Sequence, residues 1–245
     1  MTRENTNCTG DRLTVVIPSK NEGINLYFTL MHLNNQHGIR GTRVVVADSS
    51  TETSSKHWLL HAQTKLKNLR IERTEGGYPA KARLEGSKRV TTDFVLFLDA
   101  DMWLWEDGVI EKTIREISKA GTDLVTTTVE TDTPYNWVYR LFYLSQLFSQ
   151  WVLRSPFALG GFQLWRTEAY WKVGGYKAEE LFAEDYSISR RVPPERFRVI
   201  RVGGVYTSAR RFKKKGVMWM ITVMIKSYIN RRDPEFFKRS HGYWD

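Results

Sequence analysis

The chain has 245 residues, of which 41% are hydrophobic and 26% are charged, and its formal net charge is +10. This composition is globular and excludes disordered, collagen-like and coiled-coil proteins. A single cysteine, Cys8, excludes a disulfide framework and a cysteine-based zinc site, and it indicates a reducing compartment. The N-terminus is polar, and no run reaches the roughly 18 apolar residues of a spanning helix. We therefore expect a soluble or membrane-surface protein.

In the first half of the chain, short apolar runs alternate with amphipathic ones. The apolar runs predict strands over residues 13–18, 42–48, 68–73, 93–99 and 123–130. Helical spacing of apolar residues predicts helices over residues 23–36, 56–66, 76–90 and 107–121. This alternation predicts an α/β fold with a mostly parallel sheet that is covered by helices on both faces.

The second half breaks this alternation. An aromatic-rich helix is expected over residues 134–157, and residues 160–176 predict a strand, a short helix and a glycine turn. A helix is expected to start within residues 183–192, followed by one or two strands over residues 196–207. Residues 216–232 form an amphipathic segment whose apolar run is about half of a bilayer span.

The positive charge is concentrated at the C-terminal end. Residues 186–245 contain 15 Lys and Arg and only four acidic residues, whereas residues 1–185 contain 22 basic and 23 acidic ones. A segment of this charge suits nucleic acid, anionic lipid or a phosphorylated ligand. A basic face that meets only solvent is the alternative.

Acidic residues follow the most apolar strand, where ligands of open α/β sheets bind. Asp99 and Asp101 form an Asp-x-Asp pair at its end, and such carboxylates can share a hard cation and a hydroxylated ligand. A solvated strand-end turn is the alternative for this pair. Glu184 and Asp185 stand at a predicted helix start, either as a charge pair that the helix dipole favours or as a general base.

Two glycine pairs, Gly160–Gly161 and Gly174–Gly175, would let the backbone approach a ligand closely, or they form ordinary turns. His32, His37, His57 and His61 show no metal-ligand spacing, and we expect them to be exposed or structural.

Taken in order, these segments resemble the family-2 glycosyltransferases with the nucleotide-sugar-binding GT-A fold. The resemblance rests on VVIPSKNE, VVVADSST, the stretch GGYPAKARLEGSKRVTTDFVLFLDADM, GGFQLWRTEAYWKVGGY and AEDYSISRRV, and it covers about Leu13 to Gly216. It implies a Rossmann-like GT-A domain over residues 1–212. The nucleotide-binding half would cover about 12–130 and the acceptor-binding half about 131–212. A basic amphipathic helical extension, 213–245, would follow.

The resemblance also implies roles for individual residues. Asp101 would ligate Mn²⁺ or Mg²⁺, Asp99 would face the ribose or the metal, and Asp185 would be the base with Glu184 beside it near the acceptor. The remaining candidates would contact the nucleotide or its diphosphate: Pro18, Glu22, Asp48, Lys81, Arg83, Arg210 and Arg211. Two alternatives exist for Arg210 and Arg211: they bind a phosphorylated acceptor, or they are surface charges that meet only solvent.

The chain departs from the family pattern at two places. Leu84 stands where many relatives carry an asparagine, which removes a polar contact. The Gln-x-x-Arg-Trp signature of processive polysaccharide synthases is missing, and residues 208–212 (SARRF) stand there instead. We therefore expect the transfer of one sugar rather than chain polymerisation.

The expected function is an inverting, metal-dependent glycosyltransferase that uses a UDP- or GDP-sugar. Its acceptor would be presented by a membrane, as a polyprenyl phosphate or lipid-linked glycan, and the enzyme would be cytoplasmic and peripheral on the membrane. The alternatives are a soluble glycosyltransferase that modifies a nucleic acid or protein, and a non-catalytic nucleotide-sugar-binding protein.

Two further expectations concern apolar residues of the second half. The segment 216–232 is predicted to lie in an anionic membrane interface, with packing onto the GT-A core as the alternative. Most tryptophans of the second half are expected to pack in the core. For four of them, a position in the lining of the acceptor site is the alternative: Trp137, Trp151, Trp165 and Trp171.

Overall fold

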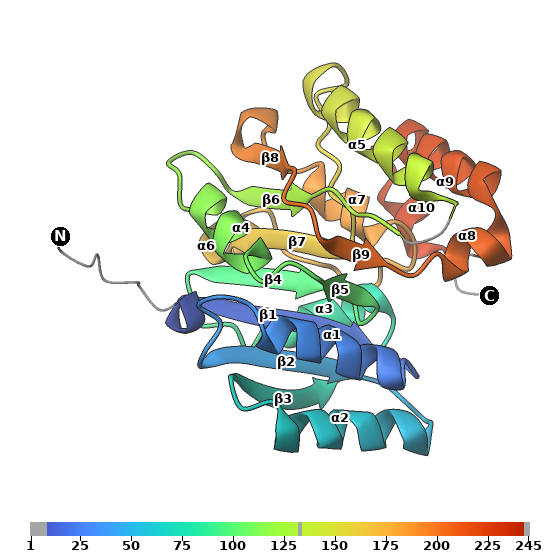
Figure 1. The fold of residues 1–245 in the computed structure, drawn as a ribbon. Coiled ribbons are helices and arrows are strands. Elements are labelled where there is room, and N and C mark those ends of the chain that lie inside the picture. The colour runs from blue at the N-terminus through green and yellow to red at the C-terminus, as the bar shows by residue number, and fades with distance from the viewer. Residues whose placement is uncertain (1–8, 132–133, 243–245) are drawn as a thin grey trace.

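The computed structural model describes residues 9–131 and 134–242. Its centre is a seven-stranded sheet in the order β3-β2-β1-β4-β7-β6-β8, and two short strands, β5 and β9, pair beside it (Figure 1). The strands of the main sheet are β1 (Leu13–Ser19), β2 (Thr42–Asp48), β3 (Leu69–Glu75), β4 (Phe94–Leu98), β6 (Leu124–Thr127), β7 (Phe162–Arg166) and β8 (Phe197–Ile200). The small sheet contains β5 (Met102–Leu104) and β9 (Val205–Thr207).

The prediction of a mostly parallel sheet is confirmed. Strands β3, β2, β1 and β4 run parallel, as do β6 and β8. Strand β7 is antiparallel to both of its neighbours, β4 and β6. The C-terminal ends of β1, β2 and β4 therefore meet at one edge of the sheet, where their polar turns come together.

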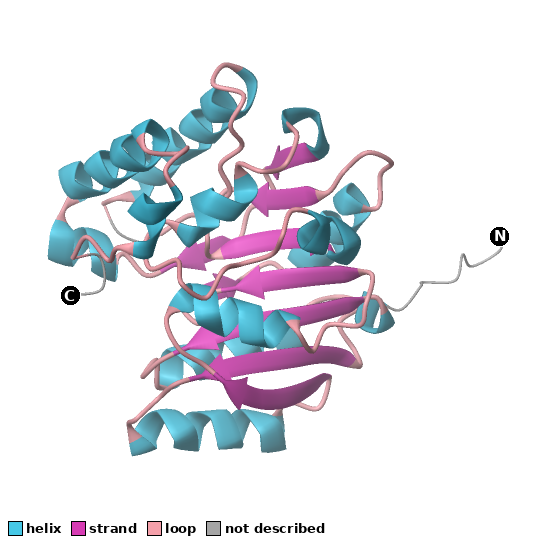
Figure 2. Cartoon of the chain, turned by 180° about the vertical axis from the view of Figure 1, so that it is seen from behind, coloured by secondary structure: helices cyan, strands magenta, loops and turns pink. Residues whose placement is uncertain are grey.

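Helices cover both faces of this sheet (Figures 1 and 2). Ten helices are described: α1 (Ile24–Asn34), α2 (Thr53–Lys65), α3 (Pro79–Ser87), α4 (Val109–Ile117), α5 (Asn136–Trp151), α6 (Thr167–Lys172), α7 (Glu184–Ser189), α8 (Arg210–Lys215), α9 (Val217–Ile229) and α10 (Pro234–Lys238). Short 3₁₀ turns stand at Thr9–Asp11 and Pro194–Arg196.

Alternate residues of each strand feed two cores. Val15 of β1 belongs to a core shared with α1, α2 and α4, whereas its neighbour Val16 belongs to one shared with α6 and α7. Helix α3 lies so close to β1 that a Cβ at Gly86 would be 2.3 Å from Val16 Cγ1. Leu84 of α3 packs against the second core, so this apolar residue serves packing.

The C-terminal helices pack onto the rest of the chain. Val138 and Phe142 of α5 form a third cluster, against which Val217, Met220 and Met224 of α9 pack. The carbonyl of Phe237 in α10, a residue that is fully buried, accepts hydrogen bonds from the backbone N–H groups of residues 181 (2.8 Å) and 182 (3.2 Å). Among the described residues, no helix is both long and apolar enough to cross a membrane.

The expectation that most tryptophans of the second half are buried is wrong. Trp165 lies in the core, where its neighbours include Tyr170, but Trp137, Trp151 and Trp171 are exposed. Two of these, Trp137 and Trp151, stand on the outer face of α5. None of the four lines the large pocket described below.

Candidate active site

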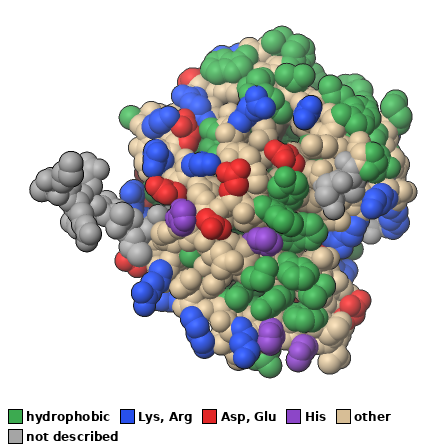
Figure 3. All heavy atoms as spheres, in the orientation of Figure 1, with side chains coloured by type: hydrophobic (Ala, Val, Ile, Leu, Met, Phe, Trp, Pro, Cys, Tyr) green, Lys and Arg blue, Asp and Glu red, His purple; other side chains and the backbone are tan. Residues whose placement is uncertain are grey.

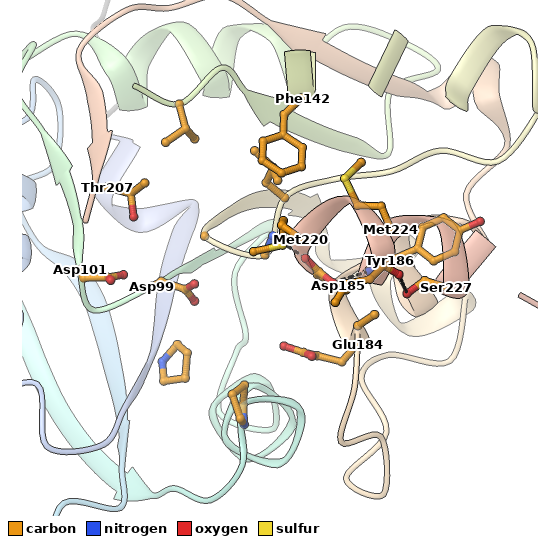
Figure 4. A pocket seen from close by; sticks show the side chains of 18 of the residues that line it. Asp99, Asp101, Phe142, Glu184, Asp185, Tyr186, Thr207, Met220, Met224 and Ser227 are labelled. Atoms are coloured by element: carbon orange, nitrogen blue, oxygen red, sulfur yellow. Dashed lines mark hydrogen bonds between the residues drawn. The ribbon is translucent and has the colours of Figure 1, made fainter. Parts of the chain in front are cut away.

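A pocket of about 1010 Å³ lies at the C-terminal ends of β1 and β4. Its walls come from the turns after these strands, the loop before α3, residues 157–161, the start of α7, and helices α5, α8 and α9. Figure 4 shows Asp99 and Asp101 on one side of this space and Glu184 and Asp185 on the other. The two acidic pairs that the sequence singles out therefore face one pocket from different elements.

Most of the predicted site residues line this pocket: Pro18, Glu22, Arg83, Asp99, Asp101, Glu184, Asp185 and Arg210. Asp48 and Lys81 do not. Asp48 ends β2 and accepts hydrogen bonds from Arg73 Nε (3.0 Å) and the Ser50 backbone N–H (3.1 Å). Lys81 is exposed, with its Nζ 3.6 Å from a carboxylate oxygen of Glu75.

One guanidinium nitrogen holds two carboxylates on the side of the pocket that the turns after β1 and β4 form. Arg210 Nη2 donates to Asp101 Oδ2 at 2.8 Å and to Glu22 Oε2 at 2.9 Å. Burial, together with the nearby Asp101 carboxylate, raises the pKa of Glu22. The side chain of Arg211 lies outside the described part of the structure.

This carboxylate pair fits a hard cation, because both oxygens already lie around a single positive centre. The described residues contain no group of three or more His, Cys, Asp or Glu side chains placed to hold a metal. A divalent ion at Asp101 would take its further ligands from water and from a bound phosphate group, as Mg²⁺ commonly does. The carboxylates present thus fit a cation that also contacts a bound ligand.

Arg83 connects the two sides of the pocket. Its Nη2 donates to Asp99 Oδ1 at 2.6 Å and its Nη1 to Glu184 Oε1 at 2.6 Å. The Arg83 side chain is buried, and so is Glu184, whereas the Asp99 side chain is 35% exposed, so the charge-assisted hydrogen bond to Glu184 is the better shielded from water. This arginine ties the Asp-x-Asp turn after β4 to the first residue of α7.

The Asp185 carboxylate is half-buried and held by backbone groups. Its Oδ2 accepts from the Gly160 N–H at 3.0 Å, and its Oδ1 accepts from the Tyr186 N–H at 2.8 Å. Burial, and then the neighbouring Glu184 carboxylate, raise the pKa of Asp185 to about 7 against the opposing charge of Arg83. A carboxylate with a pKa near neutral pH is suited to accept a proton during a reaction.

The two glycine pairs differ in what they contact. A Cβ at Gly160 would lie 3.1 Å from Asp185 Oδ2, and one at Gly161 would lie 2.9 Å from Met102 Sδ. The first pair therefore lets the backbone approach the carboxylate closely. Gly174 and Gly175 have φ values of 88° and 59° and form a turn outside the pocket lining.

The pocket also has an apolar end that the sequence motifs do not reveal. Phe142 of α5 lines it together with Met220 and Met224 of α9 (Figure 4), and Phe148 of α5 belongs to the same lining. The only signal in the sequence is the three- and four-residue spacing of large apolar residues in both segments. That spacing predicts an apolar helix face without showing what the face covers.

The fold and the site together define a glycosyltransferase of the GT-A type, with a Rossmann-like sheet and an acidic strand end facing a second acidic pair. The model of glycosyl transferase family 2 matches residues 14–174, and the chain belongs to this family. No curated protein sequence matches the chain.

Solved structures share this fold. A mannosyltransferase from Pyrobaculum calidifontis, determined with GDP-Man and Mn²⁺, is 20% identical with a TM-score of 0.61 over 94% of this chain and 67% of its own. TarS from S. aureus is 20% identical with a TM-score of 0.62 over 95% of this chain and 45% of its own, so the chain spans less than half of TarS. Mannosyl-3-phosphoglycerate synthase from Rubrobacter xylanophilus is 14% identical with a TM-score of 0.60 over 97% and 79%.

Proposed function

We propose that this enzyme transfers one sugar, with inversion, from a nucleotide-sugar to an acceptor that is activated by Asp185. The observation that carries the proposal is the half-buried Asp185 carboxylate, whose pKa is raised to about 7, in the same pocket as the Asp-x-Asp turn. The donor would lie along the ends of β1 and β4, with Pro18 and Glu22 at its nucleotide. Asp48 and Lys81 do not line the pocket, and they remain candidates for contacts with the donor.

In the transfer step, an acceptor oxygen bonds to the anomeric carbon of the sugar while the bond from that carbon to the diphosphate oxygen breaks. The electron pair of the broken bond stays with the nucleoside diphosphate, and the proton of an acceptor hydroxyl moves to Asp185. Attack from the face opposite the leaving group inverts the anomeric centre. If the acceptor oxygen belongs to a phosphate, Asp185 has little proton to take and only orients the acceptor.

Mn²⁺ or Mg²⁺, when bound, would neutralise charge on the leaving diphosphate, and Asp101 is the proposed ligand, with Asp99 as the second candidate. A structural neighbour was solved with GDP-Man and Mn²⁺ and another with UDP-GlcNAc, which supports a UDP- or GDP-sugar as donor. Arg210 then contributes its positive charge to the diphosphate, and Arg211 follows it in α8. Arg83 acts by holding Asp99 and Glu184 in place.

We further propose an acceptor presented at a membrane, such as a polyprenyl phosphate or a lipid-linked glycan. The apolar end of the pocket and the basic residues 213–215 beside it support this choice. The enzyme would then be cytoplasmic and peripheral on an anionic membrane. A soluble acceptor of nucleic acid or protein is the second candidate, because the same basic segment suits phosphates.

A thermal-shift screen with Mn²⁺ tests the donor site against UDP-, GDP-, CMP- and dTDP-sugars, since stabilisation grows with the ratio of ligand to dissociation constant. We expect one class of nucleotide to raise the Tm, and the wild type then to hydrolyse that donor slowly. Asp185→Asn should keep the shift and lose the hydrolysis. A donor that binds without any turnover would instead support a non-catalytic binding protein.

A further inference from the structure

Helix α5 carries apolar side chains outside and polar ones inside. Its large apolar residues recur every three or four positions and are each between 51% and 58% exposed: Trp137, Leu141, Leu144, Phe148 and Trp151. Its buried face includes three polar residues: Gln146, Ser149 and Gln150. Val138 and Phe142 are buried too, but the exposed side of α5 carries more large apolar residues than its buried side, unlike an ordinary amphipathic helix at a protein surface.

Helix α9 is apolar on both faces. Met220 and Met224 face the pocket, while Met218 and Ile229 on the other side are 72% and 67% exposed. Thr222 and Lys226 are also exposed on this helix, and the stem of a lysine can lie along an apolar surface while its charge stays in water. In the described structure protein covers one side of α9, so the exposed apolar side chains of the other side are open to an apolar partner.

The two exposed faces form one surface, which we call the α5–α9 face. The helices pack together through Phe142, Met220 and Met224, and Figure 3 shows hydrophobic side chains gathered over this region of the molecule. Contiguous exposed apolar surface of this kind marks an interaction site. Lysines at 213–215 precede α9 and arginines at 231–232 follow it, a charge pattern that favours an anionic bilayer as the partner.

The pocket opens onto this face. Phe148 and Ile225 both line the pocket and are 54% exposed, so they stand at its mouth. From this mouth the apolar end of the pocket continues inward to Asp185. An acceptor that enters here meets apolar side chains first and the carboxylate last.

We infer that the α5–α9 face lies in the surface of an anionic membrane, and that the apolar end of the pocket holds the hydrocarbon chain of a lipid acceptor. This inference rests on the proposed transferase function and adds the route and the class of the acceptor. The chain would enter between Phe148 and Ile225, while the phosphate or sugar end of the lipid reaches Asp185.

The first test measures co-sedimentation of the full chain with vesicles of phosphatidylglycerol and phosphatidylcholine in equal amounts, at low salt. The double variant Leu141→Ser/Leu144→Ser, or Met218→Ser/Ile229→Ser if the first does not fold, should lower the partition coefficient about tenfold or more, because apolar area no longer enters the interface. Leu60→Ser on α2, where the side chain is 61% exposed, is the matched control and should bind as the wild type. Wild-type protein that ignores these vesicles overturns the inference.

The second test measures the affinity of butyl, octyl and dodecyl phosphate by calorimetry, below their micelle concentrations. Affinity should rise at least about tenfold from the butyl to the octyl chain, as expected when methylene groups leave water. Met224→Trp, or Ile225→Asp at the mouth if that variant does not fold, should abolish the dependence on chain length. Equal affinity for all three chains in the wild type would contradict the inference.

Donor binding and donor hydrolysis in solution keep the two proposals separate. The Leu141→Ser/Leu144→Ser and Met218→Ser/Ile229→Ser variants should retain the thermal shift with the nucleotide-sugar and the slow hydrolysis, because none of these four residues lines the pocket. Donor turnover without vesicle or chain binding overturns this inference and the membrane-presented acceptor, and it leaves the proposed sugar transfer standing. Vesicle and chain binding without any donor binding overturns the proposed transferase function.

Discussion

In the first half of the chain, most large apolar side chains lie inside and charged ones line the pocket at the strand ends, whereas α5 and α9 each expose several large apolar side chains. Val15, Val16 and Ile17 of β1 are fully buried, and the polar residues of its end line the pocket. Leu144 of α5 and Met218 of α9 are more than half exposed. The first region buries its large apolar side chains in its own core, whereas we propose that the exposed apolar side chains of α5 and α9 contact lipid.

Asp101 gives the sharpest test of the first region. Asp101→Ala should lower turnover on the order of 10³-fold or more, because the leaving diphosphate loses its charge partner. The fold should survive, since a strand-end carboxylate contributes little packing. Turnover with the donor found in the screen is the measurement, and Asp107→Ala, an exposed neighbour, is the control. Full activity of the wild type in EDTA would show that the reaction needs no metal.

Substitution of Asp185 tests whether the Glu184–Asp185 side of the pocket provides the proton acceptor of the reaction. Asp185→Asn keeps the shape but removes the proton acceptor, so kcat should fall about 10²- to 10⁴-fold. Donor affinity, measured by calorimetry, should change little. A collapse of donor binding instead would place Asp185 in the nucleotide site.

Arg83 tests whether the two sides depend on one another. Arg83→Met leaves Asp99 and Glu184 without their shared partner, and loss of one partner of a buried ion pair costs about 3–5 kcal/mol of unfolding free energy. Urea denaturation measures this change, and Arg89→Met at an exposed position should be nearly neutral. A stability loss below about 1 kcal/mol, typical of a surface pair, would mean that Arg83 does not join the two sides.

The rate should depend on pH through Asp185. Burial raises its pKa to about 7, and the base works only when ionised, so kcat should rise roughly tenfold per pH unit below the pKa and level off above it. Asp185→Asn should remove this limb. A flat profile in the wild type, with turnover intact, would indicate a phosphate acceptor that gives up no proton.

The strands and the two acidic pairs could be predicted because each depends on local pattern. A buried strand is recognised as a short apolar run. Asp99 and Asp101 directly follow such a run in the sequence, so their place in the turn after β4 does not depend on contacts with distant segments. The direction of β7 could not be predicted, because the chain returns through the long α5 before it pairs with β4. Arg83 was expected near the diphosphate, but nothing in its neighbourhood in sequence predicts that it also meets Glu184, 101 residues further on.

The exposure of α5 was missed for a different reason. Periodic spacing shows that Trp137, Leu141 and Leu144 share one face, and such a face is ordinarily assigned to the core. Which face is covered depends on partners outside the helix. Gln146 and Gln150 on the opposite face were the available signal, and Gln150 Nε2 donates to two backbone carbonyls, those of residues 194 and 197, at 2.6 and 2.9 Å.

The smallest expected effect is on the free energy of unfolding when an exposed leucine of α5 is shortened, and a buried leucine of the first region gives the comparison. Leu30 of α1 is fully buried, so Leu30→Ala should lower the free energy of unfolding by about 2–5 kcal/mol through lost burial and a residual cavity. Leu144→Ala on α5 removes a side chain that is 58% exposed, and its effect in water should stay within about 0.5 kcal/mol. Urea denaturation of both variants in the absence of lipid is the measurement. If Leu144→Ala is as destabilising as Leu30→Ala, the outer face of α5 is covered by protein, and the contrast between the two regions disappears. If Leu144→Ala leaves the free energy of unfolding unchanged in water but weakens vesicle binding, Leu144 contributes to membrane binding and not to the stability of the fold.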